Sequence, residues 1–248
     1  MLFRSESNSN LVMHNDNFMS IDLGVFNIVS CYSNVVESFN IKNNTYSDLE
    51  YRIESIQSKR DLKKKKSNRW NKLNKVYKKY KAKLTNKRKD YQHKVSKKII
   101  DICKYNSISK LIVGDIKVKK CKKEYKCKLN KSTQGIGLSR FKLFLEYKAK
   151  NINIDFIKVN ESYTSQINCL TNVKEFNSDL SIRKVKLNNK IEIDRDLNSA
   201  INIAKKYKGK WLTQSDILLN ILKGYKEMYV DYNSNLHMNR FYNNYSNL

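Results

Sequence analysis

Asp22 stands out among the few acidic residues of this chain, which has 23 Asp and Glu against 50 Lys and Arg. It lies in the apolar run Met19 to Leu23, where a carboxylate is costly unless a cation neutralises it. Four more carboxylates stand where predicted strands end or a helix begins: Asp115, Glu161, Asp194 and Asp196. Carboxylate oxygens at the ends of neighbouring elements favour a hard cation, above all Mg²⁺.

These acids predict hydrolysis of a phosphodiester, because two Mg²⁺ ions about 3.5–4 Å apart can activate a water molecule and stabilise the leaving oxygen. Each acid also has a structural explanation. Asp194 and Asp196 suit the first turn of a helix, Glu161 suits a surface loop, and Asp115 suits a turn beside Gly114. From residue types alone, a metal nuclease and a basic nucleic-acid-binding module are equally favoured.

Basic residues are concentrated in segments 51–100 and 117–131 of a chain whose formal charge is +27. Such clusters attract a polyanion and neutralise phosphates without reading sequence. A solvated surface is the alternative explanation, and a membrane surface is disfavoured because the segments lack a Trp- and Phe-rich face. The residues predicted to bind nucleic acid are Lys63, Lys64, Lys65, Lys66, Arg69, Lys119, Lys120, Lys122 and Lys123.

Composition argues against several classes of protein. No window approaches about 18 consecutive apolar residues, so no membrane-spanning helix is expected, and the first residues lack the apolar region of a secretory signal. The five cysteines are scattered and odd in number, which argues against a disulfide framework. Cys121 and Cys127 are close, but at a spacing unlike that of zinc sites.

Hydrophobic periodicity predicts the elements that position the acids. A strand over 18–24 is followed by a hairpin over 26–33 and 35–41. Helical spacing over 46–58 and onward to Ile102 predicts one long amphipathic helix or a helical hairpin, with an aromatic stripe for packing and lysines outside.

The later elements alternate between strand and helix, which favours an α/β fold with parallel pairing. In chain order they are a strand, a helix, a strand and two helices, over 110–115, 139–150, 152–159, 196–207 and 215–229. Residues 163–193 are polar and irregular, and the tail over 232–248 is expected to be loose.

Three ordered motifs carry a resemblance to a known family. They are Ser20-Ile21-Asp22-Leu23-Gly24-Val25-Phe26-Asn27, Tyr163-Thr164-Ser165-Gln166 and Asp194-Arg195-Asp196-Leu197-Asn198-Ser199-Ala200-Ile201-Asn202-Ile203. In these motifs and their spacing, over roughly residues 18–207, the chain resembles the TnpB (OrfB) family of transposon-encoded proteins, related to Fanzor proteins and type V CRISPR effectors. The resemblance implies an RNase H-like (RuvC) mixed sheet flanked by helices, with a long lysine-rich helical insertion. The implied activity is that of an RNA-guided, Mg²⁺-dependent DNA endonuclease.

The resemblance assigns the catalytic and metal-binding acids as Asp22, Glu161 and Asp196, with two Mg²⁺ ions as cofactors. Asp22 and Asp196 match the first and last acids of the family. The middle acid departs from the usual pattern, because the family commonly has a glutamate where this sequence has Gly114. In a subset with glycine there, a glutamate precedes the Tyr-Thr-Ser-Gln motif by two residues, as Glu161 does.

A second departure concerns the zinc ribbon of the family. Zinc is not expected as a cofactor of this chain. The four positions that align with its cysteines hold Asn168, Thr171, Lys186 and Asn189, and Cys169 is out of register. Those side chains cannot form a tetrahedral zinc site. We expect the insert to have lost much of its order, which could misplace Glu161 relative to Asp196.

The third departure is the short segment before Asp22, where the family has a large recognition lobe. The expected division is a remnant N-terminal segment over 1–17, a RuvC-like nuclease domain over 18–207, and a C-terminal helix and loose tail over 208–248. Within the nuclease domain, 59–105 form the basic helical insertion and 163–193 the degenerate zinc-ribbon insert.

The leading interpretation is a transposon-associated DNA endonuclease with DNA and a guide RNA as partners. The alternatives are a catalytically decayed nucleic-acid-binding remnant of the same family and a basic structural or ribosome-associated protein. The protein is expected in the bacterial cytoplasm or nucleoid, or in the nucleus of a eukaryotic or virally infected cell, and not outside the cell. The sequence leaves open the guide, the target, the host, the oligomeric state and the roles of Asp115 and Asp194.

Overall fold

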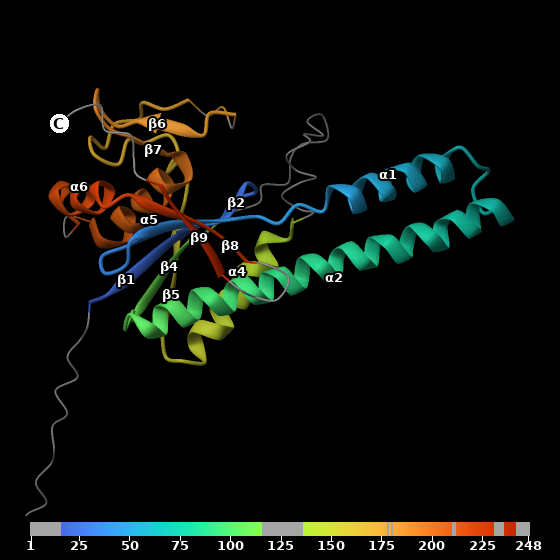
Figure 1. Ribbon diagram of the computed structural model, residues 1–248, viewed down its shortest axis with the longest axis horizontal. Helices are drawn as coiled ribbons and strands as arrows, with labels where there is room; N and C mark the ends of the chain where they lie inside the picture. The colour runs from blue at the N-terminus through green and yellow to red at the C-terminus, as the bar shows by residue number, and fades with distance from the viewer. Residues whose placement is uncertain are drawn as a thin grey trace, which may run out of the picture.

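The computed structural model describes residues 16–115, 136–177, 179, 181–209, 212–230 and 236–241. Seven strands within these residues form one mixed sheet, in the spatial order β5-β4-β1-β2-β3-β8-β9 (Figure 1). The strands are β1 Phe18–Asp22, β2 Asn27–Ser33, β3 Ser38–Lys42, β4 Lys110–Asp115, β5 Asp155–Asn160, β8 Tyr225–Val230 and β9 Leu236–Phe241. The helices are α1 Ser47–Asp61, α2 Asn68–Tyr105, α4 Leu138–Lys150, α5 Arg195–Lys208 and α6 Gln214–Leu222. The α/β fold with a mixed sheet is confirmed.

The strand directions bring the carboxyl ends of β1, β4 and β5 to one edge of the sheet. β4 pairs in parallel with β1 and with β5, and the sequence predicted the second of these pairings. β2 and β3 form an antiparallel hairpin after β1, and β8 pairs in parallel with β3. Asp22 and Asp115 end β1 and β4, and Glu161 directly follows β5. The topology therefore collects these acids at one edge, where sites on such sheets form.

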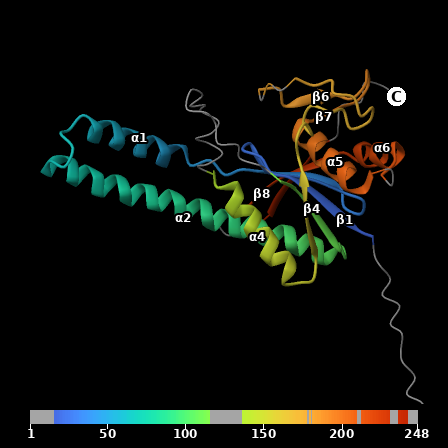
Figure 2. The same cartoon turned by 180° about the vertical axis from the view of Figure 1, so that it is seen from behind.

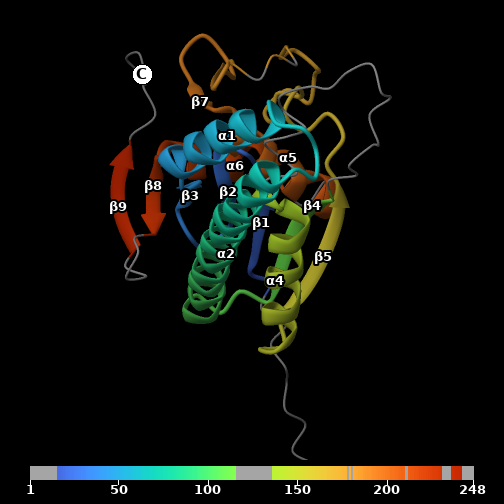
Figure 3. The ribbon, with the colours of Figure 1, turned by 90° about the vertical axis from the view of Figure 1, so that its right-hand side faces the viewer.

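Alternation of side chains gives the sheet two different faces. Ile21 points into a core shared with α2 and α4, whereas Ile112 points into a core shared with α5 and α6. Figure 3 shows α2 and α4 side by side over the first face, and Figure 2 shows α5 and α6 on the other side of the sheet. The Ser20 hydroxyl donates to the carbonyl of Ala200 in α5 at 2.8 Å. Asp22, two residues further along β1, therefore faces α5 as well.

Helices α1 and α2 form a hairpin that extends away from the sheet (Figure 1). With 38 residues, α2 is about 57 Å long. Ser67 caps α2 by accepting a hydrogen bond from the backbone N–H of Trp70 at 3.2 Å. The Arg60 guanidinium lies 4.4 Å from the ring centroid of Tyr77 and 5.8 Å from that of Trp70, so the predicted aromatic stripe packs between the two helices. No helix in the described ranges is both long and apolar enough to cross a membrane.

The C-terminal part corrects two sequence predictions. The helix expected over 215–229 ends at Leu222, and β8 begins at Tyr225. Gly224 stands between them with a φ of 81°, a left-handed conformation that glycine adopts without strain and that terminates helices. The tail expected to be loose forms β9 over Leu236–Phe241, antiparallel to β8. Pairing of β8 with β3 and of β9 with β8 decides the two outcomes, and an isolated segment does not display its strand partner.

The segment 163–193 keeps more order than the sequence predicted. Two short strands, β6 Lys184–Lys186 and β7 Glu192–Asp194, form an antiparallel pair beyond α5 (Figure 2). Apolar side chains of the segment are buried in the core beside α5: Cys169, Leu170, Val185, Leu187, Ile191 and Ile193. The expected loss of order is therefore wrong for the residues described, because this apolar surface holds the segment to the domain.

Candidate active site

Asp22 ends β1 with a partly buried carboxyl group on the face that α5 covers. Burial raises its pKa well above the usual value, and the charges of Asp196, Glu161 and Asp194 raise it further, whereas Arg195 lowers it. Electrostatic effects of this kind weaken with distance. The structure therefore brings these four carboxyl groups into one region.

The start of α5 places Asp194 and Asp196. Asp194 is the N-cap, and its Oδ1 accepts from the backbone N–H groups of Asp196 at 2.9 Å and of Leu197 at 3.2 Å, so the capping explanation holds for this residue. The Oδ2 of Asp196 accepts from Asn27 Nδ2 at 3.0 Å and lies 3.9 Å from where a Cβ on Gly24 would be. Burial raises the pKa of Asp194 to about 6 and also raises that of Asp196. The Asp196 carboxylate thus lies over the turn between β1 and β2.

Glu161 occupies the space that a side chain on Gly114 would fill. A Cβ added to Gly114 would lie 2.5 Å from Glu161 Oε2 and 3.0 Å from Ile203 Cδ1 of α5. The carboxylate therefore lies over the end of β4, on the face toward α5. Burial raises the pKa of Glu161 to about 7, and its Oε2 has no hydrogen-bond partner within the described part of the chain.

Two buried asparagines of α5 hold the loop that follows Glu161. Nδ2 of Asn198 donates to the carbonyl of Ile167 at 2.8 Å. Nδ2 of Asn202 donates to the same carbonyl at 2.7 Å and to that of Thr164 at 2.9 Å. The helix that carries the last aspartate thus also fixes the loop after the glutamate.

Asp115 ends β4 beside the cluster around Asp22, and its charge raises the pKa of Glu161. It is adjacent to Gly114 in β4, so its side chain points to the opposite face of the sheet. There its Oδ1 forms an ion pair with Lys142 of α4. This ion pair links the end of β4 to α4.

Sequence reasoning missed two residues that contact Asp196. Asn27 donates the hydrogen bond described above, and Arg183 of the insert lies with its Nη1 3.8 Å from Asp196 Oδ2. The Arg183 guanidinium also lies 4.6 Å from the ring centroid of Phe26. Asn27 is part of the first motif, which could have indicated it. Arg183 has no such signal, because only the fold of the insert brings it to the acids.

Hydrogen bonds link parts of the insert through Asn168 and Thr171, two of the positions discussed in the sequence analysis. The buried Asn168 donates through Nδ2 to Glu175 Oε2 at 3.0 Å and to the carbonyl of Leu187 at 2.9 Å. Thr171 donates through Oγ1 to Glu175 Oε1 at 2.8 Å, and Asn168 Oδ1 accepts from the N–H of Leu170 at 2.9 Å. This network connects the two halves of the insert through polar side chains.

The acids around Asp22 fit a hard divalent cation in charge and donor type. Their carboxyl groups share one partly desolvated region, and the buried Oε2 of Glu161 lacks a partner among the described residues. A cation would offset the repulsion between the desolvated carboxylates and would give Glu161 Oε2 a partner. In the described ranges, no three His, Cys, Asp or Glu side chains already converge closely enough to hold a metal ion. Binding would therefore require side-chain adjustment.

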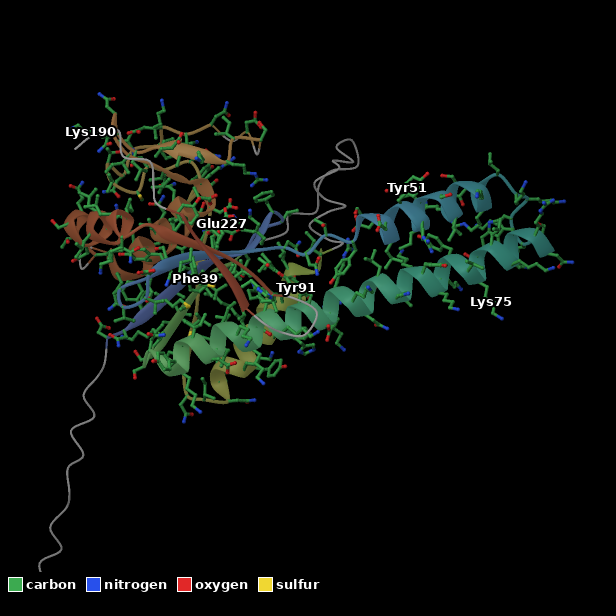
Figure 4. All side chains as sticks on the ribbon, in the orientation of Figure 1. Phe39, Tyr51, Lys75, Tyr91, Lys190 and Glu227 are labelled. Carbon is green, nitrogen blue, oxygen red and sulfur yellow. The ribbon has the colours of Figure 1, made fainter. Side chains whose placement is uncertain are left out.

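The predicted nucleic-acid-binding residues fall into two groups. The first lies at the far end of the hairpin and is exposed except for the half-buried Lys63: Lys63, Lys64, Lys65, Lys66 and Arg69. Figure 4 shows Lys75 projecting from α2 on the outer side of the hairpin. The second group lies outside the described residues: Lys119, Lys120, Lys122 and Lys123.

The sequence matches known families in two segments. Residues 6–119 match the family OrfB_IS605, described as a probable transposase, and residues 139–203 match the Cas12f1-like TNB domain. The TnpB-like protein MJ0751 of Methanocaldococcus jannaschii is 32% identical over 204 residues, which cover 77% of this chain and 69% of that protein.

The fold is similar to that of two solved Cas12f structures. A Cas12f1 chain in complex with sgRNA and target DNA matches 79% of this chain with a TM-score of 0.53 and 18% identity. A chain of a CRISPR–Cas12f ternary complex matches 75% with a TM-score of 0.57 and 18% identity. This chain spans 50% and 38% of those two chains, so the likeness shows a shared fold over half of their length or less.

Proposed function

Because the chain belongs to the TnpB (OrfB) family of transposon-encoded proteins, we propose that it is a Mg²⁺-dependent DNA endonuclease with Asp22, Glu161 and Asp196 as its catalytic acids. The position of Glu161 over Gly114 carries the proposal, because it adds a third carboxylate to the sheet edge where the two aspartates lie. Partly desolvated like charges destabilise one another. Such a cluster is more readily explained by a cationic ligand than by packing.

Asp22, Glu161 and Asp196 would hold two Mg²⁺ ions through their carboxylate oxygens. When bound, such ions activate a water nucleophile and stabilise the leaving oxygen of a phosphodiester. Asn27 orients the Asp196 carboxylate through its hydrogen bond. The side chain of Arg183 is 41% exposed, so its guanidinium is available to a phosphate at the edge of the site.

The hairpin is the proposed phosphate-binding surface. Exposed Lys64, Lys65, Lys66 and Arg69 at its end add positive charge far from the acids, and contacts of this kind supply affinity without sequence preference. One of the similar structures contains sgRNA and target DNA. We extend these partners to this chain as a guide RNA and a DNA target. This chain spans half of that Cas12f1 chain. The proposal therefore requires at least that the chain binds DNA.

Nucleic-acid binding without turnover is the second candidate function. One observation favours it: Arg183 lies 3.8 Å from Asp196 Oδ2 and neutralises charge on which a divalent cation would depend. A protein in which this contact persists would retain the fold and the basic hairpin but would lack the ion that hydrolysis requires.

A cleavage assay separates the two functions. Single- and double-stranded DNA are incubated with Mg²⁺ and either the wild-type protein or the variants Asp22→Ala and Glu161→Gln. The nuclease proposal expects cleavage by the wild type and a rate more than about 100-fold lower in both variants, since even outer partners of metal ligands contribute 10–100-fold. Retarded migration of DNA without cleavage would support the binding function instead.

Glu146→Gln is the matched control for this assay. It removes a carboxylate from α4, on the face of the sheet away from α5, where its partners are Lys150 and Lys158. Its cleavage rate should stay within about threefold of the wild-type rate, because distant sites act independently. Cleavage by Glu161→Gln at the wild-type rate would remove that residue from the proposed set.

A further inference from the structure

Lys206 of α5 holds the backbone on both sides of Glu161. Its Nζ donates to the carbonyl of Asn160, the last residue of β5, at 3.0 Å. The same Nζ donates to the carbonyl of Ser162 at 2.6 Å. The ammonium group therefore bridges the two residues that flank the proposed metal ligand.

The turn that carries Glu161 lies beyond the strand ladder of the sheet. β5 is the first strand in the spatial order of the sheet, and its pairing with β4 ends at Asn160. Tyr163 has a φ of 66°, a left-handed conformation that is strained for a residue with a bulky side chain. Thr164 donates through its N–H and its hydroxyl group to the Glu161 carbonyl at 3.1 and 2.9 Å. The conformation of this turn thus depends on donors outside the sheet.

Helix α5 supplies such donors from positions four residues apart. Asn198, Asn202 and Lys206 follow one another at this interval, so they lie on one face of the helix. The two asparagines bind loop carbonyls from Thr164 onward. Lys206 is the member of this row that binds the residues next to Glu161.

We infer that Lys206 is a positioning residue for the proposed metal site and acts on it through Glu161. Its ammonium group fixes the backbone on either side of that residue, and this backbone directs the carboxylate to its place over Gly114. The inference rests on the proposed function, because its consequence is the affinity of that site for a divalent cation. Outer partners of metal ligands typically act in this way.

The charge of Lys206 and its hydrogen bonds would affect cation binding in opposite directions. A lysine near the site repels a divalent cation, so removal of the charge alone would lower the Kd. Loss of the two hydrogen bonds would raise the Kd, because the turn and its carboxylate would then have to be ordered when the ion binds. An increase in the Kd therefore identifies positioning.

The variant Lys206→Met keeps a side chain of similar length but lacks the donor and the charge. The Kd for Mn²⁺ is obtained at pH 8 from the rise of unfolding temperature with ion concentration. It should increase about fivefold, less than is typical for a buried partner because Lys206 is exposed. Lys206→Arg retains a donor that can bridge two carbonyls, and its Kd should stay within about twofold of the wild-type value. An unchanged or lower Kd in Lys206→Met would refute the inference.

Lys205→Met is the matched control at the neighbouring residue. The Nζ of Lys205 also bridges two loop oxygens, the carbonyl of Cys169 at 2.7 Å and Oδ1 of Asn172. Those oxygens lie further along the chain than the turn that carries Glu161. The loss should therefore lower the unfolding temperature of the metal-free protein and leave the Kd for Mn²⁺ unchanged. An equal increase of the Kd in both lysine variants would indicate general loosening of the loops and would exclude a specific role for Lys206.

A double-mutant cycle tests whether the effect passes through Glu161. In the background of Glu161→Gln, Lys206→Met should change the Kd for Mn²⁺ less than about twofold, whereas independent residues would show the full factor in both backgrounds. The latter result would refute action through Glu161. If the wild type shows no Mn²⁺-dependent rise at all, the proposed metal site itself fails, and the positioning role fails with it.

Discussion

Replacement of Glu161 by glutamine is expected to stabilise the metal-free protein at alkaline pH. The usual pKa of the side chain, 4.5, rises to about 7 in the folded protein, mainly because of burial and against the opposing charge of Lys142. One pKa unit corresponds to about 1.4 kcal/mol, so the ionised carboxylate destabilises the fold by about 3 kcal/mol. Water that enters a partly exposed site reduces this energy, and we expect about 2 kcal/mol.

The pH dependence follows from the direction of the shift. Between pH 4.5 and about 7 the folded protein binds more protons at Glu161 than the unfolded chain does. The free energy of unfolding therefore falls as pH rises through this window, and the loss is complete above it. Glutamine does not titrate. The advantage of Glu161→Gln should grow from near zero at pH 4.5 to about 2 kcal/mol at pH 8.

The measurement is urea unfolding of both proteins in a chelator at pH 5 and pH 8, followed by far-ultraviolet circular dichroism. Asp22 and Asp194 titrate in both proteins, so the difference reports position 161 together with the effect of its charge on Asp22. In excess Mg²⁺ the wild type should recover the lost stability and the variant should not. A difference independent of pH, or a wild type more stable than the variant at pH 8 without divalent ions, would refute the reasoning.

Three further predictions follow from contacts described above. Gly114→Ala should lower the cleavage rate more than 10-fold, because a Cβ there lies 2.5 Å from Glu161 Oε2 and displaces that carboxylate; wild-type cleavage would contradict this. Asn168→Ala should lower the free energy of unfolding by about 2–3 kcal/mol in urea titrations, because it leaves a buried carbonyl and N–H unpaired; no change would contradict the proposed link. Replacement of Lys64, Lys65 and Lys66 by alanine should reduce the salt dependence of DNA affinity, measured by fluorescence anisotropy, by a slope of about 3; an unchanged slope would remove them from the interface.

Most of the sheet could be predicted from the sequence, because β4 is an almost wholly apolar run and apolar residues alternate with polar ones in the hairpin of β2 and β3. The pattern over 110–115 coincides with β4, and the helix over 139–150 coincides with α4 to within one residue. The last helix and the tail could not be predicted, since the apolar residues after Gly224 suit either a helix or a strand. The edge of β3 that does not pair with β2 is available to β8, and this pairing decides between helix and strand.

Some residues of the candidate site could be predicted from the sequence, and others could not. Asp22 could be selected from its apolar surroundings, and Asp196 from its motif at the helix start. Glu161 could be selected from its place after a predicted strand, but only the family resemblance assigned it as the third acid. Arg183 could not be found from spacing, since its position depends on the fold of the insert. The catalytic roles stay predictions.

A side chain at position 114 and the Glu161 carboxylate would occupy the same space, and this overlap restricts how such a site can evolve. Any side chain on Gly114 meets the Glu161 carboxylate, so acids at both positions cannot adopt the present arrangement. A lineage that moved its acid from one strand to the other would pass through either a crowded intermediate or one with neither acid. The two substitutions are therefore epistatic, and we expect their order to restrict which ancestral sequences retained activity.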